Sequence, residues 1–173
     1  MNDNVYLGNP NLKKANTPHE FTEEQVIEFI KCKNDPVYFA KNYIKIVSLD
    51  EGLTQFHPYD FQKKLIKNFH ENRFNICKMP RQTGKSTTSV SYLLHYAVFN
   101  DSTNIGILAN KAATARDLLG RLQTAYENLP KWMQQGIISW NKGSLELENG
   151  SKILAASTSA SAVRGMSFNI LFL

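Results

Sequence analysis

The sequence has few of the residues that build disulfide-linked or metal-centred proteins. Its 173 residues include two cysteines, Cys32 and Cys77, which stand too far apart to form a metal-binding pair. The four histidines also show no metal-binding spacing. Because neither a disulfide framework nor a zinc site is indicated, we expect reduced thiols and a cytosolic protein.

Long hydrophobic runs are also missing. No apolar stretch approaches the roughly 20 residues of a membrane-spanning helix, and we expect no signal peptide. Apolar residues make up 42% of the chain, which is enough for a packed core. A chain of this length suits one domain with an extension. We predict a helical extension at residues 1–56 and a core domain at residues 57–173.

Acidic residues are scarce in the second part of the chain. Residues 57–173 hold 14 basic and 7 acidic residues, a net charge of +7, whereas residues 1–56 hold 6 and 8, a net charge of −2. A basic core suits a polyphosphate or nucleic-acid partner. Ordinary solvated lysines explain the same count equally well.

The most informative stretch is residues 74–99. A β-prone run, Phe74–Lys78, leads into the loop PRQTGKST, and a helical apolar pattern follows. This order is the context of a phosphate-binding P-loop, in which Gly84 lets the backbone approach a phosphate. Lys85 would face the β- and γ-phosphates, and the Ser86 hydroxyl would bind Mg²⁺. The predicted nucleotide-binding residues of the loop are Arg81, Gln82, Thr83, Gly84, Lys85, Ser86 and Thr87.

One glycine of the full P-loop signature is absent. It belongs five residues before Gly84, where this chain has Met79. The simpler alternative is a cationic turn that caps a helix through Ser86 or Thr87. That alternative does not explain why Arg81 and Lys85 share one short loop, so the P-loop interpretation is preferred.

A glutamine stands ahead of the loop. Gln62 lies 23 residues before Lys85, between aromatic residues, on a predicted helix that ends at about His70. Its amide carries a donor and an acceptor and can therefore pair with N6 and N7 of adenine. A glutamine on a helix is ordinarily a surface residue, but this spacing favours adenine recognition.

The remaining sequence alternates between predicted helices and strands. Residues 1–20 are polar and are expected to be flexible. Helix starts are predicted at Thr22, with Gln25 completing a capping box, and at Asp35-Pro36. Residues 44–53 are expected to be a connection. The other predicted elements are strands at 104–109, 137–140, 144–148, 152–156 and 169–173, a helix from Asn110 to before Pro130, and a two-residue hairpin turn at Asn149-Gly150.

The order of these elements favours one class of P-loop ATPase. In such proteins, an acidic motif of four apolar residues and then Asp-Glu ends a central strand. The strand directly after the P-loop helix ends in Asn110, whereas the apolar run 170–173 comes one helix and one hairpin later. We therefore predict an α/β fold with a parallel sheet, of the RecA/helicase-like, additional-strand P-loop NTPase type. The sequence stops where the Asp-Glu pair would follow.

Over nearly its whole length the chain resembles the large terminase subunit of tailed bacteriophages, in the T-even-type branch. The resemblance rests on the loop, the YDFQKKLIK motif, and the segments DPVYFAKNYIKIVSLDEGL, GILANKAATARDLLGR and WNKGSLELENGSKILAASTSASAVRG. Because that branch carries a deviant loop, the resemblance removes the objection raised by Met79. It implies an ATPase that uses ATP and Mg²⁺, with Gln62 on adenine, Lys85 on the phosphates and Ser86 on the metal.

The resemblance also implies catalytic arginines. Arg81 would sense or stabilise the γ-phosphate, and Arg164 would reach the ATP of a neighbouring subunit. The alternative for Arg164 is a loop arginine that contacts DNA or solvent.

The family's role implies partners and a place in the cell. The implied partners are double-stranded DNA, the portal protein of the procapsid, the small terminase subunit and further copies in a ring on the portal, with no membrane. The implied location is the host cytoplasm, with transient docking on the procapsid. Since the acidic pair and the family's nuclease are absent, we expect nucleotide binding with poor hydrolysis. Two alternatives are a helicase-like nucleic-acid translocase and a nucleotide-binding protein without turnover.

Overall fold

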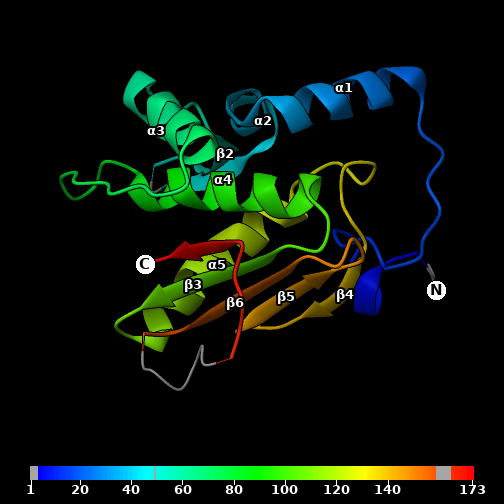
Figure 1. Ribbon diagram of the computed structural model, residues 1–173. Coiled ribbons are helices and arrows are strands. Elements are labelled where there is room, and N and C mark those ends of the chain that lie inside the picture. Colours follow the sequence, from blue (N-terminus) through cyan, green and yellow to red (C-terminus); the bar gives the residue numbers. More distant parts are fainter. Residues whose placement is uncertain (1–3, 49, 159–164) are drawn as a thin grey trace.

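The computed structural model describes residues 4–48, 50–158 and 165–173. Figure 1 shows a twisted sheet, with helix α5 behind it and helix α4 along one side. Helices α1 to α3 lie over the opposite side of α4. Among the described residues, no helix combines the length and the apolar character that crossing a lipid bilayer requires.

The main sheet has five strands in the order β4-β5-β6-β3-β7. Strand β3 (Asn104–Ala109) runs parallel to β6 and β7. The other strands are β4 (Ile137–Trp140), β5 (Ser144–Leu147), β6 (Lys152–Ser157) and β7 (Ile170–Phe172). Because β4, β5 and β6 pair antiparallel, the sheet is mixed, whereas the sequence predicted a parallel sheet with one hairpin. The strand predicted at 169–173 is present as β7, and among the described strands it pairs with β3 alone, so it lies at the edge of the sheet.

The helices begin close to the predicted positions. They are α1 (Glu23–Asn34), α2 (Pro36–Tyr43), α3 (Asp60–Glu71), α4 (Lys85–Phe99) and α5 (Ala112–Glu127), with a short 3₁₀ helix η1 (Tyr6–Gly8) before them. The capping box of Thr22 and Gln25 is confirmed, and the Asp35 carboxylate accepts hydrogen bonds from two N–H groups of the first turn of α2. Lys111, not Asn110, is the N-cap of α5.

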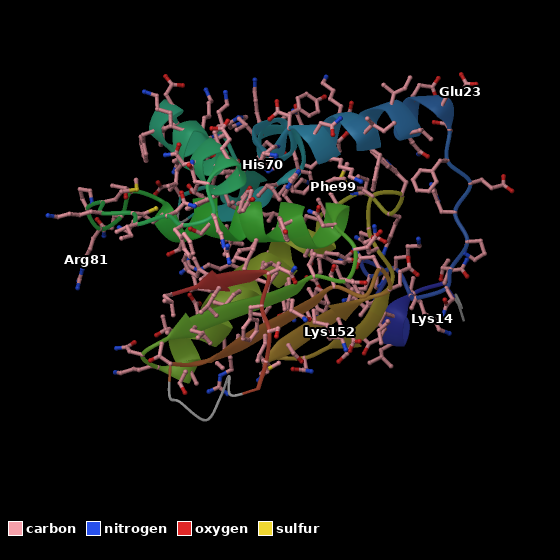
Figure 2. The ribbon with its side chains drawn as sticks, in the orientation of Figure 1. Lys14, Glu23, His70, Arg81, Phe99 and Lys152 are labelled. Carbon is pink, nitrogen blue, oxygen red and sulfur yellow. The ribbon has the colours of Figure 1, made fainter. Side chains whose placement is uncertain are left out.

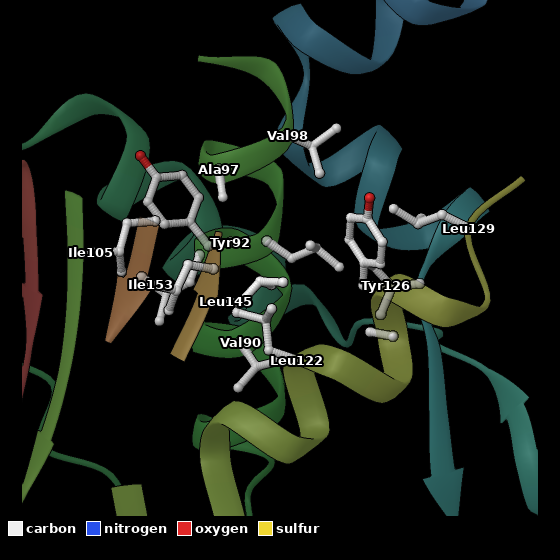
Figure 3. Close-up of a cluster of buried hydrophobic side chains, with 14 of the residues drawn as sticks. Val90, Tyr92, Ala97, Val98, Ile105, Leu122, Tyr126, Leu129, Leu145 and Ile153 are labelled. Carbon is white, nitrogen blue, oxygen red and sulfur yellow. The ribbon is translucent and has the colours of Figure 1, made fainter. Parts of the chain in front are cut away.

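Helix α4 is the centre of the fold. It is buried on nearly every side from Thr88 to Phe99, because α2, α3 and α5 all pack against it. Figure 3 shows side chains of α4, of α5 and of the sheet gathered in one buried cluster. The labelled residues of this cluster include Val90, Tyr92, Ala97 and Val98 of α4 and Leu122 and Tyr126 of α5. A helix buried in this way fixes the point at which the preceding loop joins it.

The predicted strand at Phe74–Lys78 is wrong. Phe74 is 83% exposed and Ile76 is fully exposed, and the segment has no ladder partner among the described strands. Strand preference depends largely on packing against a neighbouring strand, and no described strand lies beside this one.

The expectation that residues 1–20 are flexible is wrong for residues 4–16. Val5 forms a β-bridge with Lys13, and Lys14 forms one with Ile137 at the edge of β4. Leu12 is 2% exposed and belongs to the hydrophobic core. The segment therefore covers the edge of the sheet, which its polar composition did not reveal.

Two loops also differ from expectation. The predicted connection at 44–53 contains a small hairpin, β1 (Lys45–Ser48) and β2 (Gly52–Gln55). The turn at Asn149-Gly150 is present, but four residues separate β5 from β6 rather than two. The Asn149 side chain explains this, because its amide donates hydrogen bonds to Ala97 and Asn100 at the end of α4.

Candidate functional site

The loop at residues 80–84 leads directly into the most buried helix of the protein. Gly84 is the N-cap of α4 and has a φ of 72°, in the left-handed region that glycine favours. Lys85, Ser86 and Thr87 are therefore the first three residues of the helix. The N–H groups at a helix start have no acceptor within the helix, and the helix dipole makes this end attractive to anions.

Lys85 folds back over the loop. Its ammonium donates a hydrogen bond to the Met79 carbonyl oxygen at 3.0 Å and another to the carbonyl of Pro80. The ammonium group thus lies against the loop backbone, where two neutral carbonyl oxygens accept its hydrogen bonds. Anionic oxygens bind an ammonium more strongly than carbonyls do, so a phosphate can replace them.

Gln62 lies against the same loop. It is 4% exposed, although it belongs to the first turn of α3. Its Oε1 accepts a hydrogen bond from the Tyr59 N–H at 2.9 Å, and its Nε2 donates one to the Thr83 carbonyl at 3.2 Å. The structure therefore brings the Gln62 side chain into contact with the loop. Contact with adenine stays a prediction.

The other predicted residues of the loop occupy different positions. Arg81 and Gln82 are exposed, and Figure 2 shows Arg81 at the tip of the loop, directed away from the protein body. Thr83 closes the turn by donating from its hydroxyl to the Pro80 carbonyl at 3.0 Å. Ser86 and Thr87 are half-buried. Arg164 lies outside the described residues.

A cavity of about 620 Å³ opens beside the loop. Lys85 and Ser86 form part of its wall, together with Tyr92 further along α4. The opposite wall is strand β7, and the C-terminal end of α3 with residues 71–77 closes another side. A phosphate chain fits a space of this size. Within the described ranges, no group of three or more His, Cys, Asp or Glu side chains is placed to hold a metal ion.

Sequence reasoning missed the stacking of the two aromatic residues that flank Gln62. Tyr59 and Phe61 are 70% and 44% exposed, and their rings stack with centroids 5.8 Å apart and an interplanar angle of 10°. Large aromatic faces that remain in solvent beside a nucleotide loop can stack on a base. The sequence signal was the alternation of aromatic and polar residues in YDFQ, which does not specify whether the rings are buried.

A polar centre lies behind the loop helix. His95 of α4 is 1% exposed, and its Nε2 lies 2.9 Å from the Cys32 carbonyl. Burial lowers the pKa of His95 to about 4, and the nearby His70 acts in the same direction. Burial raises the pKa of the Cys32 thiol to about 12, assisted by Glu28. Glu28 in turn accepts hydrogen bonds from the hydroxyls of Tyr38 and Tyr43, both at 2.8 Å, and thereby joins α1 to α2.

Two comparisons with known proteins bear on the family and the fold of the chain. Residues 76–173 match the family described as the N-terminal part of the terminase large subunit of T4likevirus type. The structure is similar to that of the HK97 bacteriophage large terminase, with a TM-score of 0.63 and 19% sequence identity. That similarity covers 80% of this chain but 30% of the HK97 protein, so this chain spans less than a third of its length. At this identity the similarity establishes the fold alone.

Proposed function

Because the chain belongs to the T4-like family of phage terminase large subunits, we propose that its residues 80–87 form a P-loop that binds ATP with Mg²⁺. The observation that carries this proposal is the position of Gly84. Its left-handed conformation turns the chain so that Lys85 and Ser86 start a helix at the wall of a cavity. The fold proposed for the core is accordingly that of a P-loop NTPase.

Each loop residue has a distinct proposed role. Lys85 exchanges its two carbonyl partners for oxygens of the β- and γ-phosphates. The N–H groups of Gly84, Ser86 and Thr87 face the same anion. Arg81, at the tip of the loop, is exposed and can swing toward the γ-phosphate.

The residues present fit a magnesium ion only in combination with a nucleotide. Bound Mg²⁺ would neutralise part of the charge of the phosphates. Ser86 is the residue of this chain proposed to hold it, because its hydroxyl stands at the second position of α4 on the cavity wall.

Gln62 and its aromatic neighbours are proposed to hold the base. Two bonding positions of the Gln62 amide are used by Tyr59 and Thr83, which leaves one N–H and one lone pair for adenine. The exposed rings of Tyr59 and Phe61 offer a surface on which the base can stack.

The proposed role of the whole protein follows from its family. Terminase large subunits are ATPases, and this one is proposed to couple ATP hydrolysis to packaging of double-stranded DNA into the procapsid. The proposed partners are the portal protein, the small terminase subunit and further copies in a ring, and Arg164 is proposed to serve the ATP of the neighbouring copy. The proposed location is the host cytoplasm. A helicase-like translocase would share the loop, but the family match over residues 76–173 favours the terminase.

Equilibrium titration tests the proposal directly. The 173-residue chain is titrated with a fluorescent ATP analogue in the presence of Mg²⁺, and unlabelled ATP is then used to displace it. Saturable binding that ATP displaces supports the P-loop. Absence of binding at millimolar nucleotide would contradict it.

A further inference from the structure

Gln62 connects two elements that are distant in sequence. Its Oε1 is bonded to the N–H of Tyr59 at the start of α3, and its Nε2 is bonded to the carbonyl of Thr83, 21 residues later. With the side chain 4% exposed, solvent does not compete for either bond. The amide thus fixes the distance between the start of α3 and the loop.

The same amide also packs against Gly84. A Cβ atom on Gly84 would lie 2.4 Å from Nε2 of Gln62, closer than two such atoms can approach. The amide therefore rests on the α-carbon of the residue that begins α4. Gln62 touches the two residues immediately before Lys85.

The loop has little other support. Thr83 bonds to Pro80, and Lys85 bonds to Met79 and Pro80, all within the loop and its helix start. Among the hydrogen bonds between described residues, the bond from Gln62 is the one that joins residues 79–83 to another helix. Gln82 has a φ of 63°, a left-handed conformation that costs energy in a residue other than glycine. An external contact must therefore help to hold this shape.

We propose that Gln62 is a positioning residue for the phosphate loop. By fixing Thr83 and Gly84 it directs the N–H groups at the start of α4 and the Lys85 ammonium toward the cavity. The inference rests on the proposed function, because it assumes that the loop binds phosphate. It goes beyond adenine recognition, since a positioned loop favours any ligand with a phosphate chain, whether or not the ligand carries a base.

Inorganic tripolyphosphate separates the two roles of Gln62. In Gln62→Met the side chain keeps its length but loses both hydrogen bonds. Gln123→Met is the matched control, because the Gln123 amide also donates to a backbone carbonyl, that of Asn141, at 2.9 Å. Affinities for tripolyphosphate, ATP and GTP are measured by calorimetry for both variants and the wild type. Circular dichroism and thermal melting confirm that each variant is folded.

We expect Gln62→Met to bind tripolyphosphate about 3- to 10-fold more weakly, the effect of one hydrogen bond, and Gln123→Met to bind as the wild type does. If Gln62→Met retains wild-type tripolyphosphate affinity and loses affinity for ATP alone, Gln62 reads the base and does not position the loop. If the wild type binds none of the three ligands, the proposed function is wrong, and the positioning role of Gln62 is then wrong as well.

Native-state trypsin cleavage gives a second readout that general destabilisation does not alter. Arg73 and Arg81 are both exposed on the segment before α4, but Arg81 alone lies in the loop that Gln62 holds. The ratio of cleavage at Arg81 to cleavage at Arg73 should rise several-fold in Gln62→Met. An unchanged ratio would show that Gln62 does not restrain the loop.

Discussion

The Lys85 ammonium donates a hydrogen bond to the Met79 carbonyl at 3.0 Å. Met79 stands where the full P-loop signature has a glycine, yet the contact uses a backbone oxygen that every residue possesses. Methionine in place of glycine at position 79 therefore keeps the backbone carbonyl that accepts the hydrogen bond from Lys85. A phosphate that binds Lys85 has to displace this carbonyl.

Replacing Lys85 by alanine should abolish measurable nucleotide binding. Hydrogen bonds to charged groups contribute about 1.5–3 kcal/mol each, so the loss of two from the ammonium weakens binding by about 100-fold or more. Titration with a fluorescent ATP analogue measures the effect. Lys152→Ala is the control, because Lys152 is paired with Glu146 at 2.9 Å on strand β6. Equal affinities of the Lys85 variant and the wild type would rule out the P-loop.

Replacing Ser86 by alanine should remove the benefit of magnesium and leave part of the binding. The N–H group of residue 86 is unaffected by the change, whereas the hydroxyl proposed to hold Mg²⁺ is lost. ATP affinity is measured with Mg²⁺ and with EDTA. We expect the two values to converge in Ser86→Ala and to differ in the wild type. A variant that responds to Mg²⁺ as the wild type does would exclude Ser86 as a ligand.

The wild-type chain should prefer ATP to GTP. The free N–H and lone pair of the Gln62 amide match N6 and N7 of adenine, whereas guanine presents two acceptors there. One bidentate pair discriminates by about 1–3 kcal/mol. Competition of ATP and GTP against one fluorescent analogue measures the preference. If the two nucleotides compete equally, the base is held by stacking alone.

The free energy of unfolding should fall as pH is lowered from neutral toward 4. The His95 pKa is lowered from 6.5 to about 4 in the folded protein, where His95 is packed against Phe39, Phe99 and His70 and bonded to the Cys32 carbonyl. Between these pH values the unfolded chain binds a proton that the folded chain excludes. The free energy of unfolding is therefore expected to fall by roughly 3 kcal/mol in total, most of it below pH 6.5.

Urea titrations at several pH values between 7.5 and 4.5 measure this loss. His95→Leu should flatten the pH dependence, and His57→Gln, at an exposed position, should not. A wild-type stability that is constant over this range would show that His95 is not buried in its neutral form.

Leu12→Ala should destabilise the protein by about 2–4 kcal/mol, the usual cost of a large-to-small substitution in a core. Leu12 is 2% exposed, whereas Leu7, five residues earlier, is 87% exposed. Leu7→Ala is therefore the matched control and should change stability little. Chemical denaturation of both variants decides whether residues 4–16 belong to the folded core. Similar losses in the two variants would indicate that the N-terminal segment is not packed as described.

The features that sequence reasoning located correctly depend on local chemistry. The caps at Thr22 and Asp35 need one polar side chain and the N–H groups beside it, and both are present. The loop before α4 was recognisable because Gly84 and Lys85 have fixed positions within a short motif. The spacing of Gln62 from Lys85 suggested adenine recognition, which stays a prediction, whereas the bond from Gln62 to Thr83 was not foreseen.

The errors involve partners that are far away in sequence. Leu12 is buried in the core, and the backbone N–H of its neighbour Lys13 donates a hydrogen bond to Gln134, 121 positions later. No local pattern within a run of asparagines and lysines indicates such a contact. The run Phe74–Lys78 shows the opposite error. Its residues favour a β-strand, but no described strand pairs with it, so no strand forms there. The division between residues 1–56 and 57–173 stays a prediction.

The unequal burial of the two cysteines makes the loop directly observable. Cys32 is fully buried with its thiol pKa raised, whereas Cys77 is exposed and lines the cavity beside Lys85 and Ser86. Because the thiolate is the form that reacts, a maleimide dye will modify Cys77 and spare Cys32 without any engineering of the sequence. The unaltered protein can therefore carry one fluorophore at the mouth of its proposed nucleotide site. Ligand arrival and loop movement become changes in emission that can be followed in real time.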